Sequence, residues 1–214
     1  MSPSTTLPQR YRRGCGVAGL KKSVGGRRTR RGKTIGTTKI DGVTVPIDHN
    51  GAYPLAGWEI EGALHDVVPV LPSTEPLPRH PGVYVYNTRP SGATTPTTPG
   101  HWVAVRVPRD VDDPKEFFDS AGRSPSAYPG LLEGECEKKM VYNPLPLQEQ
   151  GTFACGHYVT AYCAFRLVGW TMEDFLSLFN PFEPRVNDTI AVHLATPMVE
   201  RVRRKCKSPP VYDV

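Results

Sequence analysis

The sequence has no long hydrophobic run, and this absence narrows the class of protein. Of its 214 residues, 38% are hydrophobic, but no stretch approaches the ~20 apolar residues that a membrane-spanning helix needs. No apolar segment follows Arg10, Arg12 and Arg13, so the N-terminus does not have the pattern of a secretory signal. We therefore expect an intracellular protein without a membrane partner, folded as one large domain or as one domain with a tail.

The cysteines lack the pairing that a metal site would show. There are five of them, an odd number, at irregular spacing and with no CxxC pair: Cys15, Cys136, Cys155, Cys163 and Cys206. The missing CxxC pair argues against a zinc site. Without an export signal, the thiols are expected to be reduced. The pattern requires no metal or other cofactor, and one thiol remains available for a reactive role.

Acidic residues are missing from the first 39 positions. These positions hold 11 Lys and Arg, whereas the rest of the chain holds 15 Lys and Arg against all 21 acids, and the whole chain carries a net charge of +5. The segment is also rich in Gly, Ser and Thr, so it cannot bury enough apolar surface to become ordered. We predict a disordered basic arm over residues 1–39. Such an arm is typical of nucleic-acid contact, and a solubilising or nuclear-targeting tail is the alternative.

Order is predicted to begin near Ile40, with strand patterns before helical ones. The stretch from Trp58 to Val70 fits one short helix with Ile60, Leu64 and Val67 on one face. Alternating β-branched and aromatic residues then predict four strands, at residues 83–86, 101–107, 116–120 and 139–142.

Helical patterns follow the strands. Residues 155–167 have helical spacing, with Tyr158, Tyr162 and Phe165 on one side. Thr171 is expected to cap a second helix, and Asn187 a third helix over residues 188–195. The basic residues 201–214 are predicted to form a frayed tail, which leaves residues 40–200 as the folded domain. Strands first and helices last indicate an α+β fold.

Two residues suited to acid–base chemistry lie at the ends of neighbouring predicted strands. His101 opens one strand and Asp119 closes the next, so antiparallel pairing would place the carboxylate beside the imidazole and fix its tautomer. Cys155 opens the predicted helix 155–167, where the positive end of the helix dipole stabilises a thiolate. A thiolate beside a base is the arrangement that nucleophilic catalysis needs.

A side-chain amide upstream of the cysteine completes the pattern. Gln148, seven residues before Cys155, is expected to offer its amide N–H to a developing oxyanion, with the backbone N–H of Cys155 as the second donor. Gln150 is the rival for this role. Gly156 would let a substrate approach the nucleophile closely. His157 competes as a base in sequence, but two residues along a helix point to different faces.

The strings that carry these residues resemble one protease family. The strings are 100–105, 117–122, 147–148 and 154–158, and their order His, Asp, Gln, Cys resembles the adenovirus endopeptidase (adenain) family, with its relatives in Maverick/Polinton-type and adintovirus-like elements. The Gln-to-Cys separation looks like that of the adenain branch, because it is one residue longer than in the SUMO-specific proteases. Asn87-Thr88 and Asn187-Asp188 also resemble the family, and the resemblance covers roughly Val83 to Val192.

The resemblance implies a papain-like, adenain-like fold: a small mixed sheet packed against C-terminal helices, with the catalytic cysteine at a helix N-terminus. It implies a viral-type cysteine endopeptidase that cleaves precursor polypeptides during virion maturation, in the virion and the host nucleus. His101 would be the general base, Asp119 its orienting partner, Gln148 the oxyanion donor and Cys155 the nucleophile. DNA is implied as a stimulator, which the basic arm would suit, and an activating peptide is left open.

Two other functions fit the same sequence. An isopeptidase that removes a ubiquitin-like modifier would use the same four catalytic residues. A DNA-packaging protein would use the basic arm, with an inert protease-like domain. The complete set of four residue types favours an enzyme over an inert domain.

Overall fold

The computed structural model describes residues 36–40, 43–48, 50–88, 100–128, 130–132 and 140–205. Predictions for Cys15, Cys136, Cys206 and most of the basic arm lie outside the described residues. The elements are β1 (Gly36–Ile40), β2 (Val43–Ile47), α1 (Gly57–Ala63), β3 (Val70–Pro72), β4 (Gly82–Asn87), β5 (Trp102–Val107), β6 (Lys115–Phe118), the 3-10 turn η1 (Pro125–Ala127), β7 (Met140–Tyr142), α2 (Cys155–Leu167), α3 (Met172–Leu176) and α4 (Pro184–Lys205).

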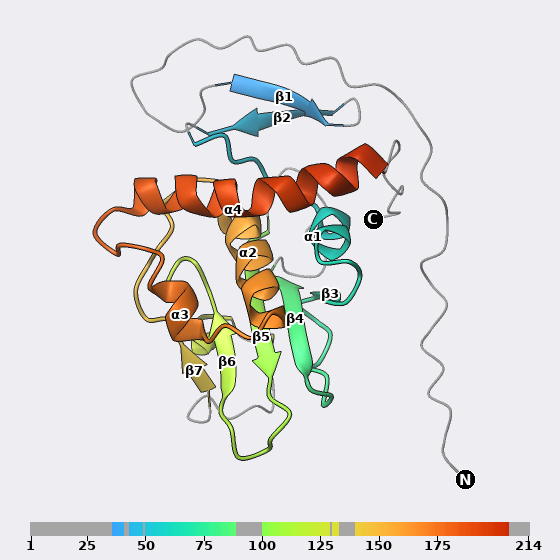
Figure 1. Ribbon diagram of the computed structural model, residues 1–214, viewed down its shortest axis with the longest axis vertical. Coiled ribbons are helices and arrows are strands. Elements are labelled where there is room, and N and C mark those ends of the chain that lie inside the picture. Colours follow the sequence, from blue (N-terminus) through green and yellow to red (C-terminus); the bar gives the residue numbers. More distant parts are fainter. Residues whose placement is uncertain are drawn as a thin grey trace.

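Five strands form one mixed sheet in the order β3-β4-β5-β6-β7 (Figure 1). The central strands β4, β5 and β6 pair antiparallel, whereas the outer strands β3 and β7 run parallel to their neighbours. The central strands lie where the sequence predicted them, because β-branched and aromatic residues suit strands buried on both faces. Since α2, α3 and α4 all follow the sheet, the predicted α+β class is confirmed.

Helix α2 lies between the sheet and α4 (Figure 1), and it packs against β4 and β5 on one side and α4 on the other. Side chains alternate along β5. Trp102 and Ala104 belong to the helix-side core, while Val103, Val105 and Val107 belong to a second cluster on the opposite face of the sheet. The prediction that the three valines share a face is confirmed, and both faces of β5 are buried.

The first helix is shorter than predicted. Helix α1 ends at Ala63, and the chain turns at His65 and Asp66, whose φ angles are 57° and 58°. Positive φ angles lie outside the right-handed helix, so the helical pattern stops before Val67. Val67 is 60% exposed instead of facing the core, and Val68 is buried in its place.

A two-stranded hairpin, β1–β2, precedes the rest of the fold and lies beyond α4 from the sheet (Figure 1). Because β1 starts at Gly36, residues 36–39 of the predicted arm belong to a strand, and order starts earlier than Ile40. The Thr, Ile and Val residues on either side of Asp41-Gly42 are typical of a hairpin sequence. The prediction of an arm over residues 1–39 depended on the charge of this segment, which extends into β1 and hides the strand pattern there.

The last helix is longer than predicted at both ends. Helix α4 begins at Pro184, before Asn187, and continues through Pro197 to Lys205. The predicted cap at Asn187 and the predicted frayed start of the tail at Arg201 are therefore both wrong. Proline suits the first helical position, because the N–H that it lacks has no intrahelical partner there. The extension past Pro197 requires tertiary contacts, since an interior proline removes a hydrogen bond.

Contacts with α1 stabilise the C-terminal half of α4. Val202 lies against Gly62, where an added Cβ would come within 2.7 Å of a Val202 methyl group. Arg203 forms an ion pair with the buried Glu59, and its Nε donates to Glu59 Oε1 at 2.5 Å. Glu59 also accepts from the N–H of Ala56 at the start of α1, at 2.8 Å. These partners are far apart in sequence, so local pattern did not predict that the helix reaches this far.

Candidate active site

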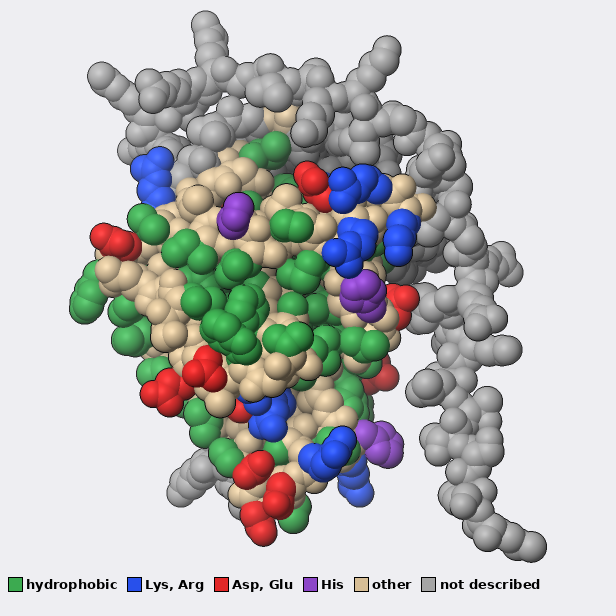
Figure 2. Space-filling view, viewed as in Figure 1, with side chains coloured by type: hydrophobic (Ala, Val, Ile, Leu, Met, Phe, Trp, Pro, Cys, Tyr) green, Lys and Arg blue, Asp and Glu red, His purple; other side chains and the backbone are tan. Residues whose placement is uncertain are grey.

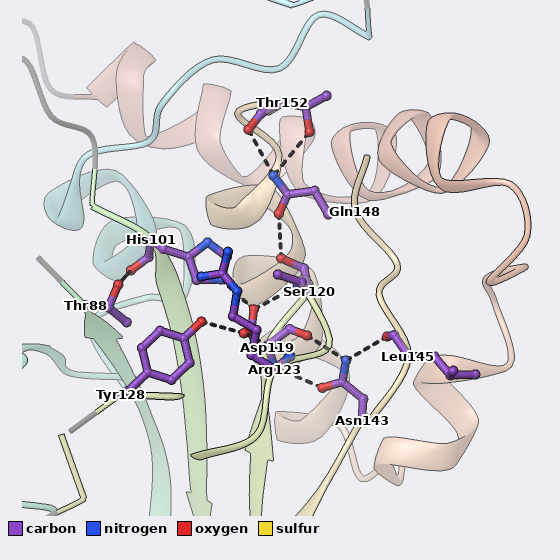
Figure 3. A network of polar contacts seen from close by, with 11 residues as sticks. Thr88, His101, Asp119, Ser120, Arg123, Tyr128, Asn143, Leu145, Gln148 and Thr152 are labelled. Carbon is purple, nitrogen blue, oxygen red and sulfur yellow. Dashed lines mark hydrogen bonds and ion pairs between the residues drawn. The ribbon is translucent and has the colours of Figure 1, made fainter. Parts of the chain in front are cut away.

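Two strands of the sheet bring a histidine and a carboxylate together. In the antiparallel pair β5–β6, Ala104 lies opposite Phe118, so His101 before β5 and Asp119 after β6 lie at the same end. His101 Nε2 donates to Asp119 Oδ1 at 2.5 Å (Figure 3). The carbonyl of His101 accepts from the N–H and the hydroxyl of Thr88, at 2.8 and 3.0 Å. The structure thus pairs the two residues as the strand order predicted.

Asp119 accepts hydrogen bonds from further donors. Its Oδ1 accepts from the N–H of Ala121 at 2.8 Å, and its Oδ2 accepts from the Tyr128 hydroxyl at 2.5 Å and the N–H of Arg123 at 3.3 Å. Asn143 accepts from the N–H of Asp119 at 2.9 Å and donates to its carbonyl at 2.6 Å (Figure 3). Tyr128 and Asn143 were not predicted, because no local pattern links a residue after η1 or after β7 to a carboxylate after β6.

Both ionisable groups of this pair are moved toward their charged forms. Burial lowers the pKa of His101. The hydrogen bond to Asp119, the neighbouring thiol of Cys155 and the charges of both groups outweigh burial and raise the pKa to about 9. Burial raises the pKa of Asp119, but the hydrogen bond and charge of His101, followed by the Tyr128 hydroxyl, outweigh it and lower the pKa below its usual value. At neutral pH the pair is therefore an imidazolium and a carboxylate.

Cys155 is the first residue of α2, as predicted, and is partly exposed. Because Asp119 occupies Nε2 of His101, Nδ1 is the ring nitrogen left to act on Cys155, which lines the same cavity. The next residue, Gly156, packs against Leu55, and an added Cβ would lie 2.8 Å from Leu55 Cβ. The glycine therefore allows α2 to pack closely inside the protein, which corrects the expectation that it makes room for substrate.

Gln148 lies in the wall of the same site. Its Oε1 accepts from the Ser120 hydroxyl at 2.7 Å, so its Nε2 is turned the other way. Nε2 donates to the carbonyl of Thr152 at 3.0 Å and lies 3.2 Å from the Thr152 hydroxyl (Figure 3). Gln148, His101 and Cys155 together line a cavity of about 240 Å³. The structure therefore brings all four predicted residues to one site.

The rival amide has a different place. Gln150 is exposed and lines a second cavity of about 530 Å³, which adjoins the first at His101 and Gln148. Gln148 lines both cavities, and Cys155 lines the smaller one. Of the two amides, Gln148 is thus the one that shares a cavity with the thiol.

Two further residues of α2 belong to the core. His157 is fully buried and meets the edge of the Tyr53 ring, with centroids 5.3 Å apart. Burial, followed by the charge of Arg203, lowers the pKa of His157 to about 3, so the ring is neutral. Cys163 is fully buried in the helix-side core, and burial raises the pKa of its thiol. Of the two cysteines in the described part of the chain, Cys155 is the accessible one.

The described residues contain neither a metal-binding cluster nor a membrane-spanning helix. Among them, no group of three or more His, Cys, Asp and Glu side chains is placed to hold a metal ion. Within the same ranges, no helix combines the length and the apolar character needed to cross a membrane.

Comparison with known proteins gives little further information. No protein-family model matches the chain, and no curated protein matches it. Among solved structures, the chain is similar to the central domain of the uncharacterized protein Lpg1148 from Legionella pneumophila, with 18% sequence identity, coverage of 57% of this chain and 70% of that chain, and a TM-score of 0.31. This similarity is too low to bear on function.

Proposed function

We propose that the chain is a cysteine endopeptidase of the adenain type, with Cys155 as nucleophile, His101 as general base, Asp119 as its orienting partner and Gln148 as oxyanion donor. One observation carries the proposal: the imidazole of His101 is hydrogen-bonded to Asp119 at 2.5 Å and lines the same cavity as Cys155 at the start of α2. A thiol, a base and an orienting carboxylate in contact are what nucleophilic catalysis by cysteine requires. The mixed sheet and C-terminal helices would then form a papain-like domain.

The reaction follows from these positions. Nδ1 of His101 carries the proton of the Cys155 thiol, whose sulfur attacks the carbonyl carbon of the scissile peptide bond, and an electron pair moves to the carbonyl oxygen. When that pair returns, the C–N bond breaks and a thioester with Cys155 remains. The imidazolium of His101, whose pKa is raised to about 9, gives its Nδ1 proton to the leaving amine. The neutral imidazole then removes a proton from water, which hydrolyses the thioester and restores Cys155. Asp119 holds the ring in one orientation throughout.

Two donors would stabilise the oxyanion. Nε2 of Gln148 carries two hydrogens, and the Thr152 carbonyl at 3.0 Å takes one of them. The other makes the longer contact of 3.2 Å with the Thr152 hydroxyl, and it is the one that would exchange this contact for the oxyanion. The backbone N–H of Cys155, in the first turn of α2, would be the second donor.

A polypeptide substrate would lie across the two cavities. The cavity of about 240 Å³ at Cys155 is walled by Pro54, Trp102 and Phe153, so we assign it to the acyl side, where a small residue fits best. The cavity of about 530 Å³ is lined by His101, which protonates the leaving amine, but not by Cys155, so we assign it to the leaving-group side. Precursor proteins of a virion are the proposed substrates, in the virion and the host nucleus.

Thiol labelling tests the nucleophile. Iodoacetamide at mildly acidic pH should alkylate Cys155 well ahead of the other cysteines, because Cys155 is partly exposed and shares a cavity with the base His101. Mass mapping of partly reacted protein gives the order of reaction. Cys155→Ser should abolish both fast labelling and cleavage of a peptide library. Cys163→Ala is the matched control on the same helix and should retain both.

Equal labelling of all cysteines in the folded protein would contradict the assignment of Cys155. Cleavage of a ubiquitin-like fusion in preference to precursor peptides would favour the isopeptidase alternative. Fast labelling without cleavage of any peptide or fusion would favour the inert DNA-packaging alternative.

We also propose nucleic acid as a partner, bound through the basic arm. Most of the arm lies outside the described residues, and the folded domain offers a second basic surface. Lys and Arg side chains gather over the C-terminal end of α4 (Figure 2), where Arg201, Arg203, Arg204 and Lys205 occur. The two surfaces are distinguished by deletion of the arm. A DNA-stimulated activity would follow from either.

A further inference from the structure

A buried carboxylate lies behind the loop that precedes α2. Asp188 of α4 is fully buried, and three groups donate to it. Its Oδ2 accepts from the Thr152 hydroxyl at 2.7 Å, and its Oδ1 accepts from the Tyr158 hydroxyl at 3.1 Å and the N–H of Glu149 at 3.3 Å. These three donors are all neutral. Because a buried charge held by neutral donors is costly, stability alone does not account for it.

The contact with Thr152 leads to the oxyanion donor. A threonine hydroxyl has one hydrogen and two acceptor lone pairs. That hydrogen has two acceptors in reach, Asp188 Oδ2 at 2.7 Å and the carbonyl of Glu149 at 3.0 Å, and the shorter contact to a carboxylate favours Asp188. A lone pair then remains for Gln148 Nε2 at 3.2 Å. The carbonyl of Thr152 accepts from the same nitrogen at 3.0 Å. Asp188 therefore orients the residue that orients Gln148.

We propose that Asp188 is a positioning residue for the reaction, which acts through Thr152 to hold the Gln148 amide in the site, where its more weakly held hydrogen can turn to the oxyanion. This inference rests on the proposed function. Asn187, the preceding residue of α4, supports the same loop, because its Nδ2 donates to the carbonyl of Leu147 at 3.2 Å. The start of α4 thus supports the loop of the oxyanion donor, although Asp188 and Thr152 are 36 residues apart in sequence.

The protonation of Asp188 bears on this role. Burial raises the pKa of Asp188, and the charge of Asp48 raises it further. Hydrogen bonds from Thr152, Tyr158 and the N–H of Glu149 lower it, and the pKa of Asp188 is about 7 as a result. The titratable groups packed against Asp188 are Tyr158 of α2, Glu149 of the loop and Asp48 from the segment after β2. The carboxylate is the form that accepts from Thr152, so positioning should weaken as the pH falls below about 7.

Hydroxyl deletions on two threonines test the inference. Thr152→Val removes the link to Gln148, whereas Thr160→Val, the matched control, removes a buried hydroxyl that donates to the carbonyl of Gly156 at 2.8 Å within α2. In peptide cleavage by the full chain, Thr152→Val and Asp188→Ala should lower kcat by about 10–100-fold with little change in KM. Asp188→Asn should lower kcat less, because it keeps the shape of the side chain. Thr160→Val should leave kcat unchanged.

Two further measurements separate positioning from a structural role. Alkylation of Cys155 forms no oxyanion, so its rate should be unchanged in Thr152→Val and Asp188→Ala. Gln148→Ala should lower kcat less in the Thr152→Val background than in the wild type, because both changes remove one function. Asp188→Asn should also lose the fall in kcat that the wild type shows below about pH 7.

Wild-type kcat in both Thr152→Val and Asp188→Ala would overturn the inference. A loss of Cys155 labelling in step with kcat would overturn it as well, as would full additivity of Thr152→Val with Gln148→Ala. If Asp188→Ala does not fold, Thr152→Val and the pH profile of Asp188→Asn decide. If the wild-type chain neither labels at Cys155 nor cleaves peptides, the proposed function has failed, and the inference falls with it.

Discussion

Two carboxylates of the candidate site, Asp119 beside the sheet and Asp188 on α4, are both fully buried. Their pKa values are nevertheless shifted in opposite directions. Asp119 contacts the imidazole of His101, and the pKa of its carboxyl is lowered despite burial. Asp188 is held by neutral donors, and burial raises its pKa to about 7. Burial is common to both, so the charge of the nearest partner decides the direction of the shift.

This difference separates the site into two halves. The sheet half, with His101 and Asp119, has each charge matched by an opposite charge, so ionisation and folding support one another. The loop half, with Gln148, Thr152 and Asp188, holds an unmatched charge whose ionisation opposes folding. Buried groups that reduce stability are found where function requires them.

Removing the base should have the largest effect. His101→Asn leaves Cys155 without a proton acceptor, and we expect kcat/KM for a peptide substrate to fall by about 10⁴-fold. Labelling of Cys155 at mildly acidic pH should slow in parallel. His193→Asn, an exposed histidine on α4, is the matched control and should change neither. An active His101→Asn variant would show that His101 is not the base and that the sheet half of the site is not catalytic.

Removing the oxyanion donor should have the next largest effect. Gln148→Ala should lower kcat by about 10²–10³-fold, as loss of one oxyanion-hole donor does, with little change in the labelling of Cys155. Gln150→Ala is the matched control, and its kcat should be nearly that of the wild type. A larger loss in Gln150→Ala would show that the loop half was assigned to the wrong amide.

The loss of activity at alkaline pH should report the ionisation of His101 in the sheet half of the site. In the proposed mechanism the imidazolium of His101 protonates the leaving amine, so kcat/KM should fall as the pH rises through about 9. Because Asp119 raises the pKa of His101, the residual activity of Asp119→Asn should show this loss at lower pH. An alkaline limb that stays in place in Asp119→Asn would mean that the two groups are not coupled.

The two carboxylates should affect stability with opposite sign. The lowered pKa of Asp119 stabilises the fold above the unfolded-state pKa and is lost as the pH falls through the folded-state pKa, so Asp119→Asn should lower Tm at neutral pH. The pKa of Asp188 is raised to about 7, so its ionised form destabilises the fold above that pH. Asp188→Asn should therefore raise Tm at about pH 8.5 but not at about pH 5. Shifts of the same sign in thermal unfolding would contradict the comparison.

The basic arm should have the smallest effect on the chemistry. Deletion of residues 1–35, which spares β1, should remove most of the DNA affinity and most of its salt dependence, because neutralised phosphates release counterions. Labelling of Cys155 and cleavage of a short peptide should be unchanged. Cleavage of DNA-bound precursors should slow, because the arm concentrates enzyme and substrate on one polymer. Unchanged DNA affinity would assign binding to the C-terminal end of α4.

The sequence by itself determined the elements that depend on short-range pattern. The strands β4, β5 and β6 and the bounds of α2 lie where alternation and helical spacing predicted them, because these patterns are set by residues a few positions apart. Thr171 caps α3, and its hydroxyl accepts from the N–H of Asp174 at 3.0 Å. His101 and Asp119 were paired for the same reason, since they lie at the adjoining ends of consecutive antiparallel strands.

Tertiary structure alone decided the rest of the fold and the support of the site. Helix α4 continues past Pro197 because Val202 and Arg203 find partners on α1. Tyr128 reaches Asp119, and Asp188 reaches Thr152, across turns and loops without periodicity. Partners of this kind are set by how the sheet and helices pack, and that packing depends on burial summed over segments distant in sequence. No pattern within one segment carries this information.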